Sequence, residues 1–354
     1  MPAPDRVTAQ LWRWRAATAW TAMNRTFAVE DTGLYRERYG VNAKFDVAFL
    51  WPMTQVFGSA TDLASLSPPL ASRADVRTVT DALAGYRDDS REPPGFSSYL
   101  APPVGWLSDR YYDDNVWLGV ELVRSYDITH DPDALKYADE IFDFLISGWD
   151  TEGPDEGGIY WIESDSNHDR NTVTTGTAAL LGLMLHDRLS DEARRIEVLD
   201  WSARMYAWVY EYLADEDGIF RDHVRDDGSI DYAVYSYNQG AMIGANLWFH
   251  RLTGDALFLD RATRTAQAVL ALEDGRYFEG QEIAFNAIFF HYLLDLDQIR
   301  PDPAYRQALL RYADYIWNER RDPESGLATT SMPLTLLDQA AMVRLLALAA
   351  AASE

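Results

Sequence analysis

The sequence predicts an all-helical protein folded as an (α/α)6 toroid, a ring of six helical hairpins in which inner and outer helices alternate. Apolar residues recur at spacings of three and four along most of the 354 residues, as on one face of a helix. About twelve helices, or six hairpins of about 59 residues each, would form the ring. The segments with this spacing are 7–26, 46–66, 73–86, 115–127, 134–148, 173–187, 191–213, 236–253, 256–272, 282–295, 304–318 and 334–351.

Two kinds of helix alternate along the chain. Residues 116–120 and 241–248 are apolar on nearly all sides, which is typical of buried helices. Residues 137–144 carry their charges on one face, which is typical of an outer helix. Strand-like alternation is confined to 158–162 and 218–223. The alternative to a closed ring is an open helical solenoid, which would expose a long groove instead of a central cup.

Three predicted outer helices begin in a similar way. Asp131, Asp255 and Asp302 each follow an apolar helix, stand beside Gly or Pro, and precede an amphipathic segment. Aspartate is a favoured N-cap residue, and proline fits the first helical turn. No Gly/Ser-rich linker or run of charge divides the chain, so we expect one catalytic domain over residues 1–354.

The composition excludes several classes of function. The chain has 31 basic and 56 acidic residues, a net charge of −25, which disfavours nucleic acid and anionic membranes as partners. It has no cysteine, so disulfides, thiolate nucleophiles and Cys-ligated metals are impossible. The six histidines show no metal-binding spacing, and no glycine-rich phosphate loop is present. We therefore expect neither a metal nor another cofactor.

The N-terminal residues lack the features of a secretory signal. They contain no apolar stretch of signal length and no small-residue cleavage site. The apolar run 345–352 is shorter than the ~20 residues that cross a bilayer. The expectation is a cytoplasmic protein without a membrane segment, or a secreted one if a leader has been removed.

Four long connections are expected to carry the functional residues. They cover 88–114, 149–172, 214–236 and 273–282. In a helical toroid such loops gather at one rim, around the mouth of the central pocket. Long loops within a compact domain are usually functional.

Adjacent carboxylates at Asp113 and Asp114 are the sharpest chemical feature. Both open a predicted inner helix after a long loop. Helix capping would account for one aspartate, because carboxylates are favourable in a first turn. Two neighbouring anions repel each other, which raises the pKa of one of them. Glycoside hydrolysis needs such a pair, with one carboxylate at the anomeric carbon and a protonated partner for the leaving oxygen.

Aromatic and amide side chains flank this pair in the sequence. Trp161 follows a glycine turn and either packs in the core or offers a face for stacking on a sugar. Asn171 is either an N-cap or a ligand for sugar hydroxyls. Tyr237, Asn238 and Gln239 enter another inner helix, where Asn238 could cap, yet together they supply neutral donors and acceptors suited to a neutral sugar. Gly240 would permit a close backbone approach.

These motifs resemble glycoside hydrolase family 76, the α-1,6-mannanases. The resemblance runs in order along the chain through YYDDNVW, GGIYW, RNTVTT, YNQGAMIGA and LLDQAAMVRLLA. It implies an (α/α)6 toroid and a retaining mechanism, with Asp113 as nucleophile and Asp114 as acid/base. It also implies α-mannan or manno-oligosaccharide as the substrate. The predicted substrate-binding residues are Tyr112, Trp161, Asn171, Tyr237, Asn238 and Gln239.

Two other functions are compatible with a helical toroid. A sugar epimerase or isomerase would use a pair of pocket histidines for proton transfer, and His168 and His291 are the histidines expected nearest the pocket. A carbohydrate-binding protein with an inactive pocket would lack one of the two carboxylates. The sequence offers Asp113 and Asp114 more plainly than a histidine pair.

Overall fold

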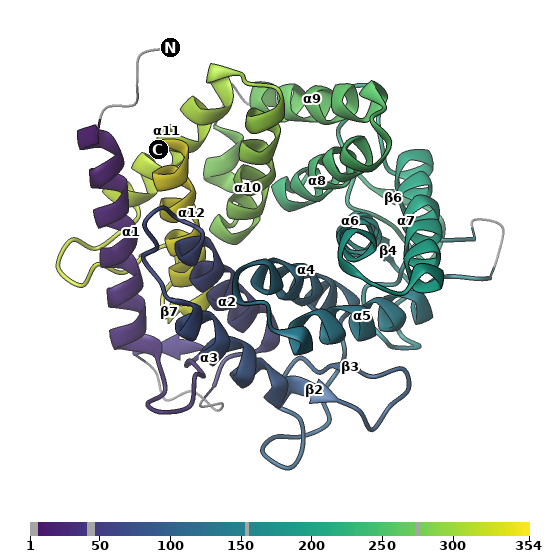
Figure 1. Ribbon diagram of the computed structural model, residues 1–354, viewed down its shortest axis with the longest axis horizontal. Coiled ribbons are helices and arrows are strands. Elements are labelled where there is room, and N and C mark those ends of the chain that lie inside the picture. Colours follow the sequence, from purple (N-terminus) through teal and green to yellow (C-terminus); the bar gives the residue numbers. More distant parts are fainter. Residues whose placement is uncertain (1–5, 41–46, 153–155, 273–275) are drawn as a thin grey trace.

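The fold is the predicted ring of helical hairpins (Figure 1). The computed structural model describes residues 6–40, 47–152, 156–272 and 276–354. The helices lie close to the predicted segments, so the fold class is confirmed. They are α1 (Arg6–Phe27), α2 (Leu50–Ala64), α3 (Arg73–Leu83), α4 (Tyr112–Thr129), α5 (Pro132–Ser147), α6 (Thr172–Arg188), α7 (Glu192–Tyr212), α8 (Ser236–Thr253), α9 (Ala256–Ala271), α10 (Ile283–Ile299), α11 (Pro303–Glu319) and α12 (Leu336–Ala352), with short 3-10 turns at Ala84–Tyr86 and Tyr277–Gly280.

The even-numbered helices form the inner ring. Each contacts the next one around the ring, and α12 returns to pack against α2. The odd-numbered helices cover this ring from outside, where α3, α5, α7 and α9 each pack on the preceding inner helix of the chain and α1 packs on α12. The contact between α12 and α2 closes the circle, which excludes the open solenoid.

Short turns lead from inner to outer helices and carry the predicted caps. The carboxylates of Asp131, Asp255 and Asp302 accept hydrogen bonds from backbone N–H groups two residues later, at 3.1, 2.9 and 2.9 Å. Gly254 ends α8 with a φ of 72°, a left-handed conformation that glycine adopts without strain. These local signals were readable in the sequence because a cap depends on residues close together in the chain.

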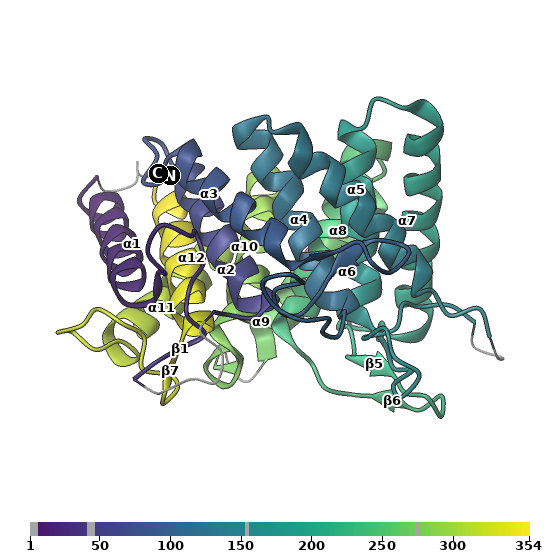
Figure 2. The same cartoon turned by 90° about the horizontal axis from the view of Figure 1, so that it is seen from below.

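Long loops lead from outer to inner helices and lie at the opposite rim, which therefore holds the N-termini of the inner helices (Figure 2). Of the two predicted strand segments, 158–162 forms only isolated bridges and 218–223 contributes its last residue to a strand. Small antiparallel sheets join the loops: β1 (Arg38–Tyr39) with β7 (Leu334–Thr335), β2 (Arg87–Asp88) with β3 (Gly95–Phe96), and β4 (Arg170–Asn171) with β5 (His223–Val224) and β6 (Ile230–Asp231).

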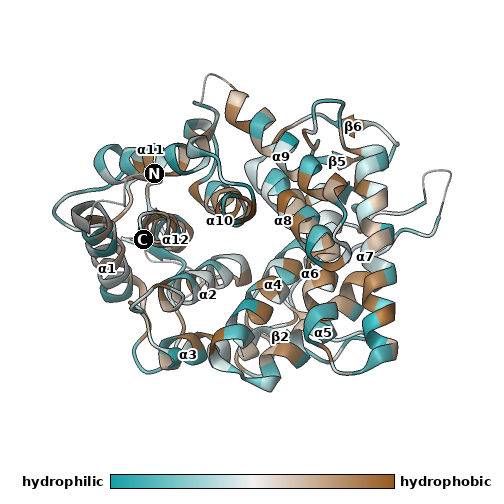
Figure 3. Cartoon of the chain, turned by 45° about the horizontal axis from the view of Figure 1, so that its top comes forward, coloured by the Kyte–Doolittle hydropathy of each residue, from teal (hydrophilic) through white to brown (hydrophobic). Residues whose placement is uncertain are grey.

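The hydrophobic core lies between the two helical layers, with hydrophilic residues toward the outside of the outer helices (Figure 3). Inner helices such as α6 and α12 are buried on almost every side. Gly240 serves this packing, because a Cβ atom there would lie 2.8 Å from the Cα of Phe289 in α10. The close approach that this glycine allows is therefore between two inner helices.

A buried ionic network joins three inner helices where the ring closes. Arg344 of α12 donates to Asp62 and Gln55 of α2 at 3.0 and 2.9 Å, and to Glu121 of α4 at 2.7 Å. Arg124 of α4 also pairs with Asp62 and Glu121. Burial opposes ionisation of Asp62, but the two arginines lower its pKa to about 2. The network fixes α2, α4 and α12 relative to one another.

None of the helices in the described ranges is both long and apolar enough to span a bilayer.

Candidate active site

The first turn of α4 carries the two adjacent aspartates. Asn115 anchors this turn to the preceding loop: its Nδ2 donates to the carbonyls of Phe96 and Tyr111 at 2.8 and 2.7 Å, and its Oδ1 accepts from the Phe96 N–H at 2.7 Å. Asn115 is fully buried, so these bonds are shielded from water. The loop and the helix start therefore hold Asp113 and Asp114 in a fixed position.

Asp113 is hydrogen-bonded as a carboxylate. One oxygen accepts from the indole Nε1 of Trp161 at 2.9 Å, and the other accepts from the backbone N–H of Asp114 at 2.9 Å. The Trp161 carbonyl in turn accepts from the N–H of Tyr112 at 2.9 Å, which ties the tryptophan loop to α4. Both donors favour the ionised form of Asp113.

Asp114 lies in a different environment. Its carboxyl makes no hydrogen bond with any residue that the structure describes, and burial followed by the charge of Asp113 raises its pKa well above the ordinary value. Burial also raises the pKa of Asp113 to about 6, with a smaller contribution from the charge of Asp222, against the opposing hydrogen bonds. Both side chains are half-buried, so a substrate can reach them. The arrangement favours an anion at Asp113 and a proton on Asp114.

Residues from the start of α8 face this pair. Burial raises the pKa of Tyr237 well above its ordinary value, and the charges of Asp222 and Asp113 add to the effect. Tyr237 therefore keeps its proton and can donate it in a hydrogen bond. Asn238 is fully buried and donates from Nδ2 to Asp222 at 3.0 Å, while its Oδ1 has no partner among the described residues.

The sheet of β4, β5 and β6 adds the remaining predicted residue. Asn171 ends β4 and pairs with His223 of β5. It occupies the N-cap position of α6 without a side-chain cap bond, and its Oδ1 is buried with no partner in the described chain. The buried amide oxygens of Asn171 and Asn238 are therefore acceptors that no described residue satisfies.

Two of the predicted sugar contacts are placed elsewhere. The Tyr112 ring is 4% exposed and stacks on Phe144 of α5 with ring centroids 4.5 Å apart, so it packs between the helical layers. Gln239 is fully buried, and its side chain binds both the N–H and the carbonyl of Phe220 at 2.9 and 2.7 Å. Because its amide is already used, Gln239 fixes the loop before α8. In this structure packing and hydrogen bonding thus already occupy both side chains, and their role as sugar ligands stays a prediction.

Sequence reasoning missed Asp222 and His223, which lie at the site. They stand inside the predicted long loop 214–236, so their position in that loop was the available signal. The two histidines that it favoured have other partners: His168 lies beside Asp226 with a side chain that is 44% exposed, and His291 lies near Asp62 in the buried ionic network. Pairing between loops of different hairpins brought His223 to the site, and local sequence does not encode that pairing.

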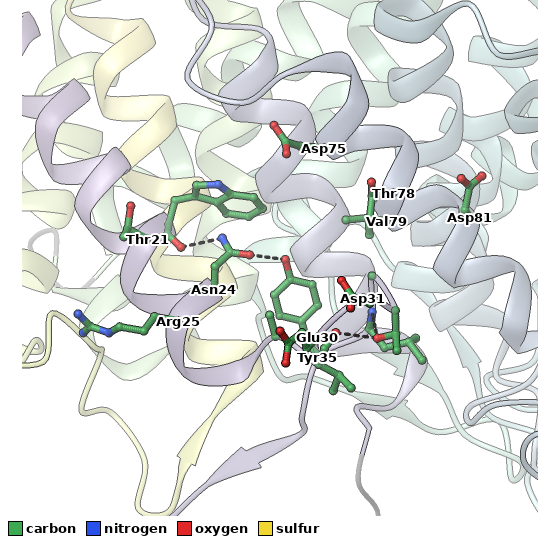
Figure 4. A pocket seen from close by; sticks show the side chains of 16 residues that line it. Thr21, Asn24, Arg25, Glu30, Asp31, Tyr35, Asp75, Thr78, Val79 and Asp81 are labelled. Atoms are coloured by element: carbon green, nitrogen blue, oxygen red, sulfur yellow. Dashed lines mark hydrogen bonds between the residues drawn. The ribbon is translucent and has the colours of Figure 1, made fainter.

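A groove on the outer wall is a separate hollow (Figure 4). It lies between α1, the following loop and α3, and has a volume of about 850 Å³. Tyr35 in this groove donates to Asn24 at 2.6 Å, and Asp31 and Asp75 are exposed to solvent. None of the predicted site residues lines it. The paired aspartates are therefore not in this groove.

The described residues contain no group of three or more His, Asp or Glu side chains arranged to hold a metal ion. What they do contain is a helical ring with two adjacent carboxyls of unequal environment, bordered by aromatic and amide side chains. Two neighbouring carboxyl groups of unequal protonation are what glycoside hydrolysis uses. The chain belongs to glycosyl hydrolase family 76, whose family model matches residues 11–331.

Solved structures share this fold over nearly their whole length. A family 76 mannosidase of Bacteroides thetaiotaomicron superimposes with a TM-score of 0.82 at 22% identity, covering 95% of this chain and 97% of the other. The α-1,6-mannanase of Salegentibacter sp. gives a TM-score of 0.78 at 23% identity, covering 96% and 99%. An inactive variant of that mannanase, in which two consecutive aspartates are replaced by asparagine, was solved with α-1,6-mannotriose.

A curated relative is similar over part of the sequence. A mannan endo-1,6-α-mannosidase of Candida glabrata is 26% identical over 175 residues. The match covers 45% of this chain and 38% of the length of the relative.

Proposed function

We propose that the protein is a retaining glycoside hydrolase that cleaves α-1,6-linked mannose in mannan or manno-oligosaccharides. The observation that carries the proposal is the unequal environment of Asp113 and Asp114. Asp113 accepts two hydrogen bonds that favour its anion, and Asp114 accepts none from the described residues while burial and its neighbour favour the proton.

The reaction follows from these two states. The Asp113 carboxylate forms a bond to the anomeric carbon as the glycosidic C–O bond breaks, and Asp114 gives its proton to the departing oxygen. Asp114, now ionised, takes a proton from water, and the oxygen of that water displaces Asp113 from the anomeric carbon. Two displacements on the same carbon leave the product with the anomeric configuration of the substrate.

Mannose as the substrate is supported by the family and its relatives. The names of the Salegentibacter and Candida proteins specify α-1,6-mannan chemistry. Near the paired aspartates, Trp161, Asn171, Tyr237 and Asn238 offer neutral groups suited to stacking and hydroxyl binding. The net charge of −25 disfavours anionic polymers such as polyuronates.

Product analysis tests the proposal directly. With an α-1,6-mannobiose substrate, NMR of the first-formed product should show α-mannose before mutarotation. Asp113→Asn should abolish cleavage of every substrate. Asp114→Asn should slow the disaccharide about 10²- to 10⁴-fold, and an activated aryl α-mannoside less, because its leaving group departs without a proton. A β-anomer appearing first, or faster cleavage of a polyuronate than of α-1,6-mannan, would contradict the proposal.

The pH profile tests the two roles. Asp113 must be ionised, so kcat/KM should fall as the pH drops below about 6. Asp114 must be protonated, so kcat/KM should fall again on the alkaline side, at a pH well above the ordinary range of a carboxyl group. A profile that lacks the acidic limb would contradict the assignment of Asp113 as the attacking anion.

A further inference from the structure

The sheet of β4, β5 and β6 holds the Asp222–His223 pair near Asp113 and Asp114. Strand β5 pairs with β4 through His223 and Asn171, and with β6 through His223 and Asp231. The carbonyl of Asp222 also accepts from the N–H of Thr172, the first residue of α6, at 2.8 Å. The backbone of this pair is therefore held by β6 of its own loop and by β4 and the start of α6 from the preceding long loop.

The Asp222 carboxylate is oriented by two partners. One oxygen accepts from Nδ2 of Asn238 at 3.0 Å, and the other bonds to Nδ1 of His223 at 2.7 Å. Asp222 is 8% exposed, so its charge is poorly screened by water. This charge acts on Asp113. Burial is the main cause that raises the pKa of Asp113 to about 6, and the charge of Asp222 adds to it.

His223 lies among carboxylates that belong to β6 or directly precede β4 and β5. Its Nδ1 contacts Asp222, its Nε2 lies 3.8 Å from Asp169, which directly precedes β4, and Asp231 of β6 faces it from the other side. Arg225 is the nearby cation and pairs with Asp231. The hydrogen bond to Asp222 is the largest of the effects that raise the pKa of His223, and the charges of the three aspartates add to it against partial burial.

We propose that His223 is a positioning residue for hydrolysis: its imidazolium orients the Asp222 carboxylate and offsets part of the charge that Asp222 projects onto Asp113. The inference rests on the proposed function for its kinetic consequences. Its structural part, the ionic bond between His223 and Asp222, is measurable without any substrate. His223 does not touch the reacting atoms and acts only through Asp222.

The proposal predicts opposite shifts for the two members of the pair. Without the imidazolium, the charge of Asp222 on Asp113 is less compensated, so the acidic limb of kcat/KM should move to higher pH by about half a unit or more. Without the Asp222 charge, Asp113 ionises more easily, so the limb should move to lower pH. A residue that serves only to keep the loop folded would not give opposite directions.

Three variants and one matched control separate position from charge. His223→Asn keeps a donor near the Nδ1 position but removes the charge, His223→Ala removes both, and Asp222→Asn removes the carboxylate. The control is His168→Asn, because His168 also pairs with an aspartate, Asp226, at 3.3 Å, but its side chain is 44% exposed against 16% for His223. We expect kcat to fall about 10- to 100-fold in His223→Ala and less in His223→Asn, with KM and kcat unchanged in the control.

A histidine NMR titration tests the bond itself. In the wild-type protein the His223 signal, assigned from its loss in His223→Asn, should titrate above the ordinary value of 6.5. In Asp222→Asn it should titrate at a lower pH than in the wild type, because the largest of the effects that raise its pKa is gone. An unchanged His223 titration in Asp222→Asn would overturn the proposal even if the enzyme cleaves mannan as proposed.

The kinetic measurements are a second test of the proposal. Shifts of the acidic limb in the same direction for His223→Ala and Asp222→Asn would overturn the proposal, as would an equal effect of His168→Asn. If His223→Ala does not fold, His223→Asn carries the same test of the charge. If no glycoside is cleaved, the proposed function fails, and the NMR titration alone then decides whether the ionic bond exists.

Discussion

The first turns of α4 and α8 are anchored to the preceding loop in the same way but carry different side chains. Each helix follows a tyrosine, Tyr111 or Tyr235, that is extended and makes no side-chain cap bond. The fourth residue of each helix is a buried amide, Asn115 or Gln239, that binds the N–H and the carbonyl of one phenylalanine in the preceding loop. We call this arrangement, a tyrosine before the helix and a buried amide as its fourth residue, the shared frame. Its role is structural in both hairpins.

The second and third helical residues are where the two regions differ. They are Asp113 and Asp114 in α4, and Tyr237 and Asn238 in α8. The start of α12 shows what an aspartate at this position does when a threonine caps the helix: the Asp338 carboxylate accepts from Thr335 Oγ1 at 2.9 Å and from Ser331 Oγ, and its N–H donates to Thr335 Oγ1. With Tyr111 at that position, Asp114 has no such partner, which leaves its carboxyl for chemistry.

The largest effect should come from the second helical position. We expect Asp113→Asn to lower kcat by more than ~10⁴-fold, since the attacking group is lost. Tyr237→Phe at the equivalent position of α8 should cost no more than about tenfold, because it removes one hydroxyl at the edge of the site. Steady-state kinetics on an α-1,6-mannobiose, with melting curves to confirm folding, measure the difference. Equal losses would show that α8 takes part in the chemistry as directly as α4.

The next effect should come from the shared frame. Gln239→Leu leaves the N–H and carbonyl of Phe220 buried without partners, so we expect the free energy of unfolding to drop by about 2–4 kcal/mol. The folded fraction should keep most of its kcat, because the Gln239 amide does not face the sugar. Chemical denaturation and active-site-normalised kinetics provide the two measurements. A variant that stays stable but loses its activity would instead support the interpretation of Gln239 as a sugar ligand.

A smaller effect should come from giving α4 the cap of α12. Tyr111→Thr would give Asp114 a threonine hydroxyl like the one that donates to Asp338. The tendency of the Asp114 carboxyl to stay protonated should therefore decrease. We expect kcat to fall about tenfold and the alkaline limb of the pH profile to move to lower pH, because a hydrogen bond to the anion lowers the pKa. Tyr111→Phe is the control. Phenylalanine places no Cβ hydroxyl at the N-cap, so the alkaline limb should not move.

The smallest effect should come from Asp338, the third residue of α12, whose carboxylate accepts from the capping Thr335. Asp338→Asn weakens one N-terminal cap and should reduce the free energy of unfolding by about 0.5–1 kcal/mol with unchanged kinetics. Thermal melting and kcat/KM on the same preparation test this expectation. A large loss of activity would mean that Asp338 contributes to the reaction and that the comparison with Asp114 fails.

The sequence by itself determined the helices, their caps and the paired carboxylates. Helical spacing of apolar residues and caps such as Asp131 depend on neighbours within one or two turns, so they are legible in a linear chain. The same holds for Asp113 and Asp114, because two adjacent carboxyls in a first turn must influence each other wherever the helix lies.

Only the tertiary structure decided which polar side chains remain available to a substrate. Tyr112 lies beside the paired aspartates in the sequence and Gln239 beside their α8 counterparts, yet packing on Phe144 and bonding to Phe220 occupy them. Conversely, Asp222 and His223 reach the site because strands from separate hairpins pair there. Side-chain occupancy is set by contacts between residues far apart in the chain, and composition or periodicity carries no record of those contacts.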